Sequence, residues 1–207
     1  MLILEQYGVK LIRLQKEQIE IVRYWRNQSD ISNYMEYRNY ITPNSQLKWF
    51  DSINNNLNYY FIIEFEKKKI GLINAKDYNK KSGFGEGGIF IWDKHYIDSF
   101  AAVFSSLCLL NFVFFKLKLS TKSVARILKD NPNAINYNKR IGYKLLPNQE
   151  NIDNQLYELT YEDYVLHGSK LNEAASLICN GSSELIYSGT ICEQNIQEIN
   201  DLLSNQS

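Results

Sequence analysis

The sequence is poor in the residues that cross-link small proteins or bind metal ions. It contains three cysteines, Cys108, Cys179 and Cys192, and two histidines among 207 residues. The cysteines are too scattered for a disulfide framework, and no CxxC or Cys/His pair has metal-ligand spacing. We therefore expect free thiols in a reducing cytoplasm and no structural metal site.

The chain also has no excess of charge of either sign. Its 23 Lys and Arg residues balance 23 Asp and Glu residues. Such a chain has no broad electrostatic attraction for nucleic acid or for an anionic membrane surface. We therefore expect no nucleic-acid partner. A local basic pocket for a phosphorylated ligand stays compatible with this balance, because net charge does not describe its distribution.

We expect neither a signal peptide nor a membrane span. The first residues, MLILEQ, contain no basic segment followed by a long apolar run. The most apolar stretch, residues 100–119, is about 20 residues long and therefore long enough to cross a bilayer. It contains Asn111, Lys116 and Lys118, and strand-like segments flank it closely. We expect a buried helix and a cytoplasmic protein without membrane insertion.

The hydrophobic pattern predicts one domain with a mixed sheet covered by helices, an α/β or α+β sandwich. We see no internal repeat and no low-complexity linker. A polar loop is expected over residues 77–85. Strands are expected over residues 9–14, 59–65, 69–75, 87–92, 123–128, 143–146 and 155–160, and helices over 18–26, 43–53, 97–119 and 132–140. After these elements we expect a helix over 161–177 and a boundary-like stretch at 179–183. A strand over 184–190 and a helix over 195–203 are expected to follow.

Two short segments late in the chain form a recognisable motif. Residues 131–135 read NPNAI, and residues 139–143 read KRIGY. Asn131 is a good cap for a helix, and Gly142 suits the reversal at its end. This pattern resembles the late motif of the GNAT N-acetyltransferase superfamily, Asn-x-x-Ala-Ile followed by Lys-x-Leu-Gly-Phe.

The resemblance implies a fold and an activity. The expected fold is the GNAT fold, a mixed and mostly antiparallel central sheet flanked by helices, over residues 1–164, with a C-terminal extension over residues 165–207. The implied activity is that of an acyl-CoA-dependent N-acetyltransferase. Acetyl-CoA would be the co-substrate, and no metal would take part.

A second match lies near the amino end. Trp25, Arg26 and Asn27, followed by Met35 and Trp49 with Ile41 between them, are similar to the pattern of bacterial GNAT enzymes that acetylate nucleotide-linked amino sugars. In those enzymes the first two helices and their loop shape the acceptor pocket. The resemblance implies that these five residues bind a small-molecule primary amine, carried by a nucleotide-linked amino sugar.

The side chains of this second match also have simpler interpretations. Trp25 and Trp49 have the helical spacing of core aromatics. Arg26 and Arg38 suit bidentate contacts with a diphosphate, but surface arginines need no such role. Both interpretations stay open at the level of sequence.

The resemblance also assigns the cofactor contacts. It implies that Asn131 hydrogen-bonds the pantetheine arm of the acyl-CoA. Ile89, Phe90 and Ile91 would expose backbone amides that polarise the thioester carbonyl. Lys139 would meet the phosphates of CoA, although a solvated helix face explains it equally well.

The sequence departs from the family at the pyrophosphate loop, which usually carries glycines. Residues 93–101 read DKHYIDSFA and contain none. Asp98 and Phe100 stand where glycines are expected, and a carboxylate repels a diphosphate. Either the loop takes another path, with the amide and hydroxyl of Ser99 serving the phosphate, or CoA binding is weak.

The general acid and the general base are assigned from single residues rather than from a motif. Glu86, at the start of a predicted strand, is our first choice for the general base, and a solvated loop acid is the simpler alternative. The tyrosine that often protonates the leaving thiolate aligns with Asn138, whose amide is not an acid. Tyr137 is one position away and points about 100° around the helix.

The leading hypothesis is direct attack of an amino sugar on acetyl-CoA, without a covalent enzyme intermediate. One alternative is a protein or amino-acid N-acetyltransferase of the same fold. Another is a catalytically idle GNAT domain that acts as a binding or scaffold module, which the glycine-free loop and Asn138 favour. The predicted strand over 184–190 could extend the sheet or pair with a neighbouring chain, so a homodimer is a further prediction.

Overall fold

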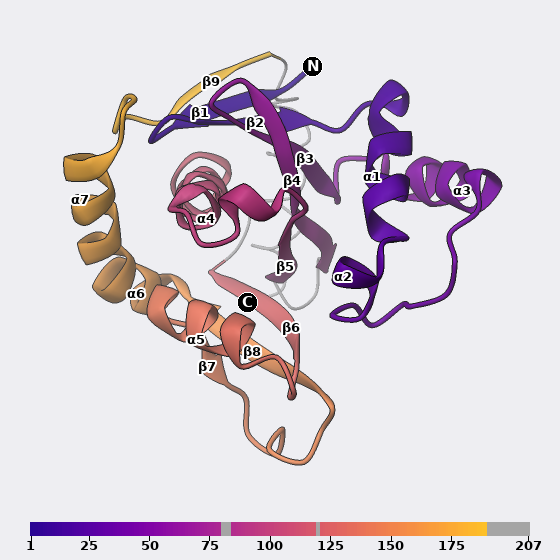
Figure 1. Ribbon diagram of the computed structural model, residues 1–207. Coiled ribbons are helices and arrows are strands. Elements are labelled where there is room, and N and C mark those ends of the chain that lie inside the picture. Colours follow the sequence, from indigo (N-terminus) through magenta and orange to yellow (C-terminus); the bar gives the residue numbers. More distant parts are fainter. Residues whose placement is uncertain (80–83, 119–120, 190–207) are drawn as a thin grey trace.

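The computed structural model of the chain describes residues 1–79, 84–118 and 121–189, and its centre is a nine-stranded sheet (Figure 1). The strand order is β7-β8-β6-β5-β4-β3-β2-β1-β9. Only β5 and β6 pair in parallel; every other neighbouring pair is antiparallel. The strands are β1 (Ile3–Gln6), β2 (Val9–Arg13), β3 (Tyr59–Phe65), β4 (Lys68–Asn79), β5 (Phe84–Ile91), β6 (Lys122–Leu128), β7 (Lys144–Leu145), β8 (Asn154–Thr160) and β9 (Ile186–Ser188). The predicted mixed, mostly antiparallel sheet is confirmed.

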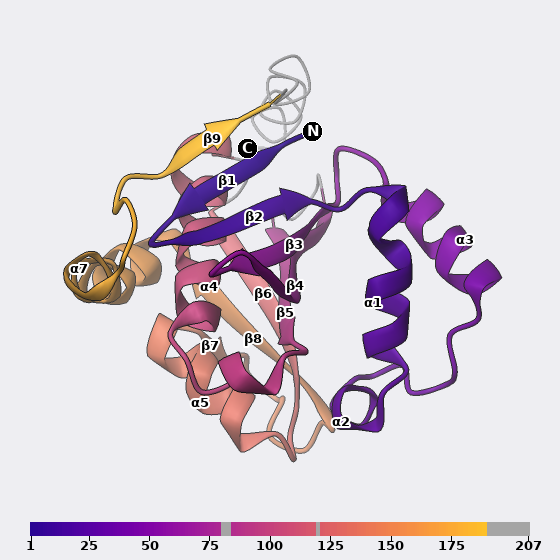
Figure 2. The same cartoon turned by 45° about the horizontal axis from the view of Figure 1, so that its top comes forward.

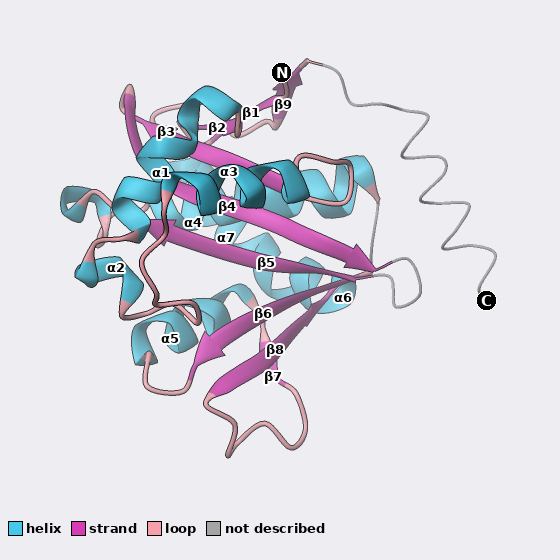
Figure 3. Cartoon of the chain, turned by 90° about the vertical axis from the view of Figure 1, so that its right-hand side faces the viewer, coloured by secondary structure: helices cyan, strands magenta, loops and turns pink. Residues whose placement is uncertain are grey.

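Helices cover both faces of this sheet (Figures 1 and 3). One face carries α1 (Ile19–Arg26), α2 (Ser29–Ser32) and α3 (Pro43–Ile53). The other carries α4 (Ala101–Asn111) with its π-helical continuation η3 (Phe112–Leu117), α5 (Pro132–Ile141), and the run of α6 (Tyr161–Asp163), the π-helix η4 (Tyr164–Gly168) and α7 (Ser169–Ile178). Two 3-10 turns complete the list, η1 (Lys16–Gln18) and η2 (Lys94–Tyr96). None of the described helices is long and apolar enough to span a bilayer.

The run of apolar residues in β3 is buried on both faces. Phe61 and Ile63 belong to the core beneath α4, whereas Tyr60 and Ile62 belong to the core beneath α1 and α3. Successive side chains of a strand point to opposite faces, so a continuous apolar run is what a twice-covered strand needs. The apolar run over residues 59–65 is therefore typical of a central strand that helices cover on both faces.

Side-chain caps and a glycine satisfy the ends of α3 and α5. Thr42 Oγ1 accepts from the amide of Ser45 at 3.1 Å, with Pro43 in the first turn of α3. Asn131 Oδ1 accepts from the amide of Ala134 at 3.0 Å, and Gly142 closes α5 with φ of 117°. Polar caps and a left-handed glycine satisfy groups that a helix leaves unpaired. The late motif thus builds the predicted helix and its reversal.

Several predicted boundaries were wrong. β1 and α2 were not expected, because each is only four residues long and shows no clear period. The long helix begins at Ala101 rather than at residue 97, since η2 and a bend occupy the preceding residues. Strands β4 and β5 both extend into the loop expected over 77–85, since β4 runs to Asn79 and β5 begins at Phe84. Backbone pairing between them continues there although the segment is polar. The expected helix over 195–203 lies outside the described residues.

The C-terminal extension packs onto the sheet and α4. β9 pairs with β1 of the same chain, with Leu4 opposite Tyr187, and so extends the sheet at this edge (Figure 2). β9 is shorter than predicted, because Glu184 and Leu185 do not pair. The helix predicted over 161–177 is confirmed, with a π-helical turn inside it. The division into a domain ending at residue 164 and an extension stays a prediction.

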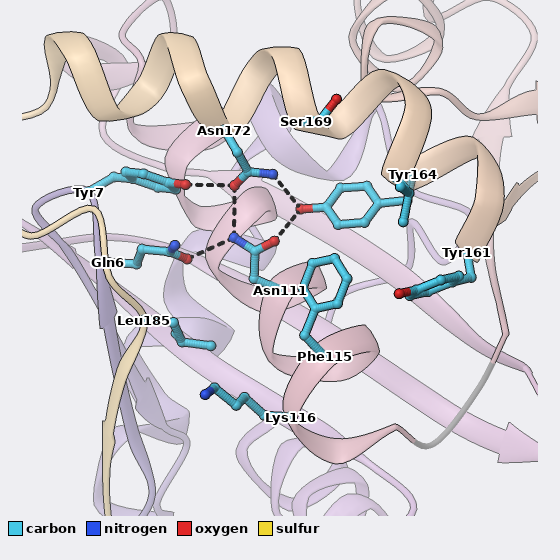
Figure 4. A pocket seen from close by; sticks show the side chains of 11 residues that line it. Gln6, Tyr7, Asn111, Phe115, Lys116, Tyr161, Tyr164, Ser169, Asn172 and Leu185 are labelled. Atoms are coloured by element: carbon cyan, nitrogen blue, oxygen red, sulfur yellow. Dashed lines mark hydrogen bonds between the residues drawn. The ribbon is translucent and has the colours of Figure 1, made fainter.

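A buried polar network joins the extension to α4 (Figure 4). Asn111 Nδ2 donates to Asn172 Oδ1 at 2.8 Å, and the hydroxyl of Tyr7 donates to the same oxygen at 2.6 Å. The hydroxyl of Tyr164 donates to Asn111 Oδ1 at 2.8 Å. The network lies at the wall of a pocket of about 480 Å³ between η3 and α7. Because these groups satisfy one another, they fix α7 against α4.

Candidate active site

The sheet is forked between β5 and β6. The two strands pair from Phe84 opposite Lys122 to Gly87 opposite Ala125, and the register described for them ends there. Beyond this point β5 continues beside β4 while β6 follows β8, so the strands diverge (Figure 3). Residues 88–91 therefore offer backbone groups that no strand on the β6 side takes up within the described part of the chain. Such groups are strong hydrogen-bonding sites for an extended ligand.

Two side chains hold the closed end of the fork. The hydroxyls of Tyr143 and Ser123 hydrogen-bond at 2.8 Å, and both lie close to Gly87, where a Cβ would come within 3.4 Å of the tyrosine hydroxyl. Burial raises the pKa of Tyr143 to about 12, so its hydroxyl keeps its proton near neutral pH. Gly142 ends α5 in the left-handed conformation, and Tyr143 follows it directly. The late motif therefore places this tyrosine at the fork.

The predicted carbonyl-polarising residues lie in the open arm of the fork. Ile89, Phe90 and Ile91 all fall within it, and their side chains alternate between the faces. Phe90 packs against the core beneath α1 and α3, whereas Ile89 and Ile91 pack against the core beneath α4. The unpaired backbone edge is the feature of the structure that fits a thioester and its pantetheine arm.

Glu86 lies at the closed end of the fork between two cations. Its Oε1 is 3.1 Å from Lys76 Nζ, and its Oε2 is 3.1 Å from Arg126 Nε. Burial favours the neutral amine of Lys76, yet the neighbouring Glu86 holds the pKa of this lysine above its ordinary value. Burial also raises the pKa of nearby Tyr60 to about 12. Glu86 is therefore a bound carboxylate rather than a freely solvated loop acid.

Lys76 and Arg126 were missed at the sequence level. They lie ten positions before and forty positions after Glu86 in the chain. The register brings them together: Lys76 pairs with Glu86 across β4 and β5, and Arg126 lies two residues beyond Val124, the partner of Glu86 on β6. Only a correct strand order and register would have predicted this cluster.

Four of the five predicted acceptor residues act in packing or in loop anchoring. Trp25 stacks on Trp92 with ring centroids 6.3 Å apart, and Trp49 meets Tyr60 edge-on at 5.2 Å. Met35 packs against the same core. These contacts support the interpretation of Trp25 and Trp49 as core aromatics.

Asn27 anchors the loop over residues 33–42. Its Nδ2 donates to the carbonyl of Ile41 at 2.9 Å, and its Oδ1 accepts from the amide of Ile41 at 2.8 Å. This pair of bonds fixes the end of α1 to the segment before α3. The loop that the family resemblance places at the acceptor is thus held by its own motif residue.

Arg26, the remaining acceptor residue, lies beside the open arm. Its Cζ is 5.8 Å from the centre of the Phe90 ring, and its Nη2 donates to the carbonyl of Tyr37 at 3.3 Å. Its Nε is buried and has no acceptor within the described residues. Burial lowers the pKa of the guanidinium, which nevertheless stays charged near neutral pH. Arg38 lies on the same loop and donates to the carbonyl of Met35 at 3.0 Å.

The glycine-free loop takes a compact path. Asp93 caps η2 by accepting from the amide of His95 at 3.0 Å. The amide of Ser99 donates to the carbonyl of Tyr96 at 3.2 Å, and its hydroxyl donates to the same oxygen at 2.8 Å. Both groups proposed for the phosphate are therefore engaged within the loop, and Ser99 Oγ also accepts from the amide of Ala101 at 3.2 Å.

The other predicted residues of the cofactor side all lie on α5 or at its cap. Asn131 is the N-cap, whereas Lys139 lies in the last turn, about 12 Å further along the axis. The structure does not bring these two together. Asn138 Nδ2 donates to the carbonyl of Ala134 at 2.9 Å.

Tyr137 joins α5 to α4. Its hydroxyl donates to the carbonyl of Ala102 at 2.9 Å and hydrogen-bonds Ser106 Oγ at 2.6 Å. Burial raises the pKa of Tyr137 far above its ordinary range. Among the described residues, no group of three His, Cys, Asp or Glu side chains is arranged to hold a metal ion.

Comparison with known proteins identifies this architecture. Residues 9–144 match the family described as the acetyltransferase (GNAT) domain, and no curated protein matches the chain. Among solved structures, the nucleotide-linked sugar GNAT FdhC is similar with a TM-score of 0.68 and 21% identity, over 83% of this chain and 96% of FdhC.

Two further similar structures are those of acetyltransferases named for other acceptors. The spermidine N-acetyltransferase of Vibrio cholerae, solved with CoA and spermine, is similar with a TM-score of 0.64 and 18% identity, over 76% of this chain and 98% of its own. The aminoglycoside acetyltransferase AAC(6')-Ib, solved with coenzyme A, has a TM-score of 0.66 and 13% identity, over 76% and 98%. At these identities the structures show a shared fold. The family match covers well over half of the chain, which therefore belongs to the GNAT family of N-acetyltransferases.

Proposed function

We propose that the chain transfers the acetyl group of acetyl-CoA to the primary amine of a nucleotide-linked amino sugar. The observation that carries this proposal is the charge of the acceptor face. Glu86 and Asp77 balance the charges of Lys76 and Arg126, and Arg26 adds a cation whose Nε has no acceptor among the described residues. A polyamine or an aminoglycoside is a polycation and would be repelled there. An acceptor with a diphosphate would be attracted.

The fork supports a direct mechanism. The free amine attacks the thioester carbonyl, a C–N bond forms, and the C–S bond breaks to release CoA as a thiolate. The carbonyl oxygen is stabilised by open backbone amides of residues 88–91. Glu86 takes the amine proton as general base, after the acceptor displaces one of its two cations. A thiol of ordinary pKa, about 8.5, leaves without a strong acid, so water can protonate the thiolate.

The cofactor side keeps its predicted assignments as proposals. Asn131 holds the pantetheine arm at the start of α5. The phosphates lie near the first turn of α4, where helix amides point outward, with Ser99 in the preceding loop. Lys139 contributes only if the nucleotide end of CoA reaches the last turn of α5. Cys108 and Cys179 are free thiols, consistent with a reaction in the reducing cytoplasm.

The test is a panel of acceptors incubated with acetyl-CoA. Release of CoA thiol and the mass of the product are measured for nucleotide-linked amino sugars, spermidine, kanamycin, amino acids and a peptide. We expect turnover of an amino-sugar nucleotide. Preferential turnover of the peptide or an amino acid would support the alternative of a protein or amino-acid acetyltransferase. Binding of acetyl-CoA without turnover of any amine would support an idle binding module.

We also propose a homodimer, formed through β9. This strand is at the edge of the described sheet, and Ile186 and Tyr187 are about half exposed on it. An edge strand with apolar side chains is a template for pairing with a second copy. Light scattering of the full chain and of a chain ending at Tyr164 tests this proposal. A monomer for the full chain would contradict it.

A further inference from the structure

The pocket between η3 and α7 is a cavity that the active site does not use. Its volume is about 480 Å³, and six of its eleven lining residues follow residue 144, where the family match ends. The other five come from β1, the turn after it, and the end of α4 with η3. One of these, Phe115, is about 20 Å along the helix from Ala101 in the first turn of α4. The pocket is therefore built largely by the extension, at the opposite end of α4.

Two π-helical segments line this pocket. η3 supplies Phe115 and Lys116, and η4 supplies Tyr164 and Val165. Such turns are rare, and they occur frequently at functional sites. The last residue of η4 is Gly168, where a Cβ would come within 2.5 Å of the ring of Tyr164. The sequence thus has a glycine where this irregular turn needs one, and irregular backbone on two sides of one cavity points to a function for it.

One wall of the pocket is aromatic and only partly covered (Figure 4). The ring of Phe115 lies 5.8 Å from the ring of Tyr161 and 6.0 Å from the ring of Tyr164. Phe115 and Tyr161 are 40% and 37% exposed, and Val165 is 45% exposed. Apolar surface that water still reaches is stabilised when a second ring or chain covers it. This wall therefore favours a flat apolar ligand.

The other wall is polar, but its donors are already used. The hydroxyls of Tyr7 and Tyr164 both donate within the buried network. The side-chain amide of Asn111 donates twice, as does that of Asn172. Burial raises the pKa of both tyrosines, so neither becomes an anion near neutral pH. This wall is therefore neutral and leaves the recognition of a charged group to another residue.

Lys116 gives the pocket a single charge. It is the only charged residue among the described lining residues, and its ammonium has no ion pair or hydrogen bond in the described part of the chain. Its amine points toward Leu185, another lining residue (Figure 4). A cation beside an aromatic wall, without a carboxylate in the lining, complements a ligand that joins one negative charge to a flat apolar body.

We propose that this pocket is a second ligand site, for a small aromatic carboxylate whose ring covers Phe115 and Tyr161 and whose carboxylate pairs with Lys116. The proposal goes beyond the proposed function, because no residue of the fork takes part in it. The volume of about 480 Å³ lies within the ordinary range of small-molecule sites, about 300–1,000 Å³. The ligand binds the end of α4 opposite the turn at which we place the CoA phosphates.

The experiment is calorimetric titration of the full chain with phenylacetate, 3-phenylpropionate and indole-3-acetate, in saturating coenzyme A so that these anions do not enter the cofactor site. The amide and the amine that correspond to the best carboxylate are titrated beside it. We expect submillimolar binding of at least one carboxylate, about three- to fivefold weaker binding of its amide, and still weaker binding of its amine. No binding of any carboxylate at millimolar concentration, or equal binding of the carboxylate and the amine, would overturn the proposal.

A pair of lysine variants tests the charge. Lys116→Met keeps the aliphatic stem, so it should weaken the carboxylate about three- to fivefold and leave the affinity of the amide unchanged. Lys118→Met is the control, because Lys118 is exposed, two positions further on, and outside the lining. It should change neither affinity. Equal effects of the two substitutions on the carboxylate would refute the contact with Lys116.

A second pair of variants tests the location. Ser169 lines the pocket from an exposed position, so Ser169→Trp should fill the mouth and abolish binding without lowering the melting temperature. Lys170→Trp, at the exposed neighbouring position outside the lining, should bind the carboxylate like the native chain. A carboxylate that binds Ser169→Trp as tightly as the native chain occupies another site, and the proposal would then be wrong.

Discussion

The carboxylate of Glu86 contacts two cations, so replacing it changes both the chemistry and the charge of the fork. We expect Glu86→Gln to lower kcat for the best acceptor by about 10²- to 10⁴-fold, the usual contribution of a general base. Steady-state rates of CoA release measure this effect. Glu158→Gln is the control, because Glu158 is similarly half-buried on the same sheet and paired with Lys122 at 3.1 Å. Rates within threefold of the native chain would leave Glu86 with a structural role only.

Tyr137 gives a contrasting prediction. Its hydroxyl bonds to the Ala102 carbonyl and to Ser106, so we expect Tyr137→Phe to lower the free energy of unfolding by about 1–2 kcal/mol. We expect kcat to stay within about threefold, because the bonded hydroxyl is not free for a thiolate. Urea unfolding and steady-state kinetics measure the two effects. A hundredfold fall in kcat at unchanged stability would instead make Tyr137 the general acid.

Among the elements, α7 depends on α4 through polar groups as well as apolar ones. The side-chain oxygen of Asn172 accepts hydrogen bonds from Tyr7 and Asn111. Its amide nitrogen donates to the hydroxyl of Tyr164 and to the carbonyl of Gly168. Rings from η3 and η4 pack alongside, with Phe114 and Tyr164 at 5.3 Å. Since we propose that the first turn of α4 lies at the CoA phosphates, the extension supports the helix that carries this proposed contact.

We expect Asn172→Ala to lower the free energy of unfolding by about 3 kcal/mol, because it leaves the buried hydroxyl of Tyr7 and one N–H of Asn111 without the acceptor they share. Urea denaturation followed by tryptophan fluorescence measures the change. Glu173→Ala, at the exposed neighbouring position of α7, should change stability by less than about 0.5 kcal/mol. Equal stabilities for the two variants would mean that the network contributes nothing to the folded state.

At the scale of the whole molecule, a net charge of zero leaves attraction of an anionic acceptor to the local cations Lys76, Arg126 and Arg26. Long-range attraction is then weak, and the ligand responds to local charge only. We expect the KM of an amino-sugar nucleotide to rise several-fold between about 0.05 and 0.5 M salt, as screening shortens the reach of Lys76, Arg126 and Arg26. The KM of a neutral amino sugar should not change. A salt-independent KM for the nucleotide would argue against an anionic acceptor.

The sequence predicted the parts of this molecule that depend on local signals. The apolar run of β3, the cap Asn131 and the reversal at Gly142 are all set within a few residues. The partners of Glu86 and the environment of Arg26 depend on strand register and on the fork, which local patterns do not encode. The role of Asn27 was likewise hidden, because its partner Ile41 is fourteen positions away.

The pairing of β1 with β9 joins almost the first residues of the described chain to almost the last. During translation β1 therefore waits for about 180 further residues, roughly 10–40 s at ordinary synthesis rates of about 5–20 residues per second. Throughout that interval one edge of β1 is an unprotected template for aggregation. Nascent chains arrested before β9 emerges should be bound by a holdase chaperone and cleaved near β1, whereas chains arrested after it should resist both.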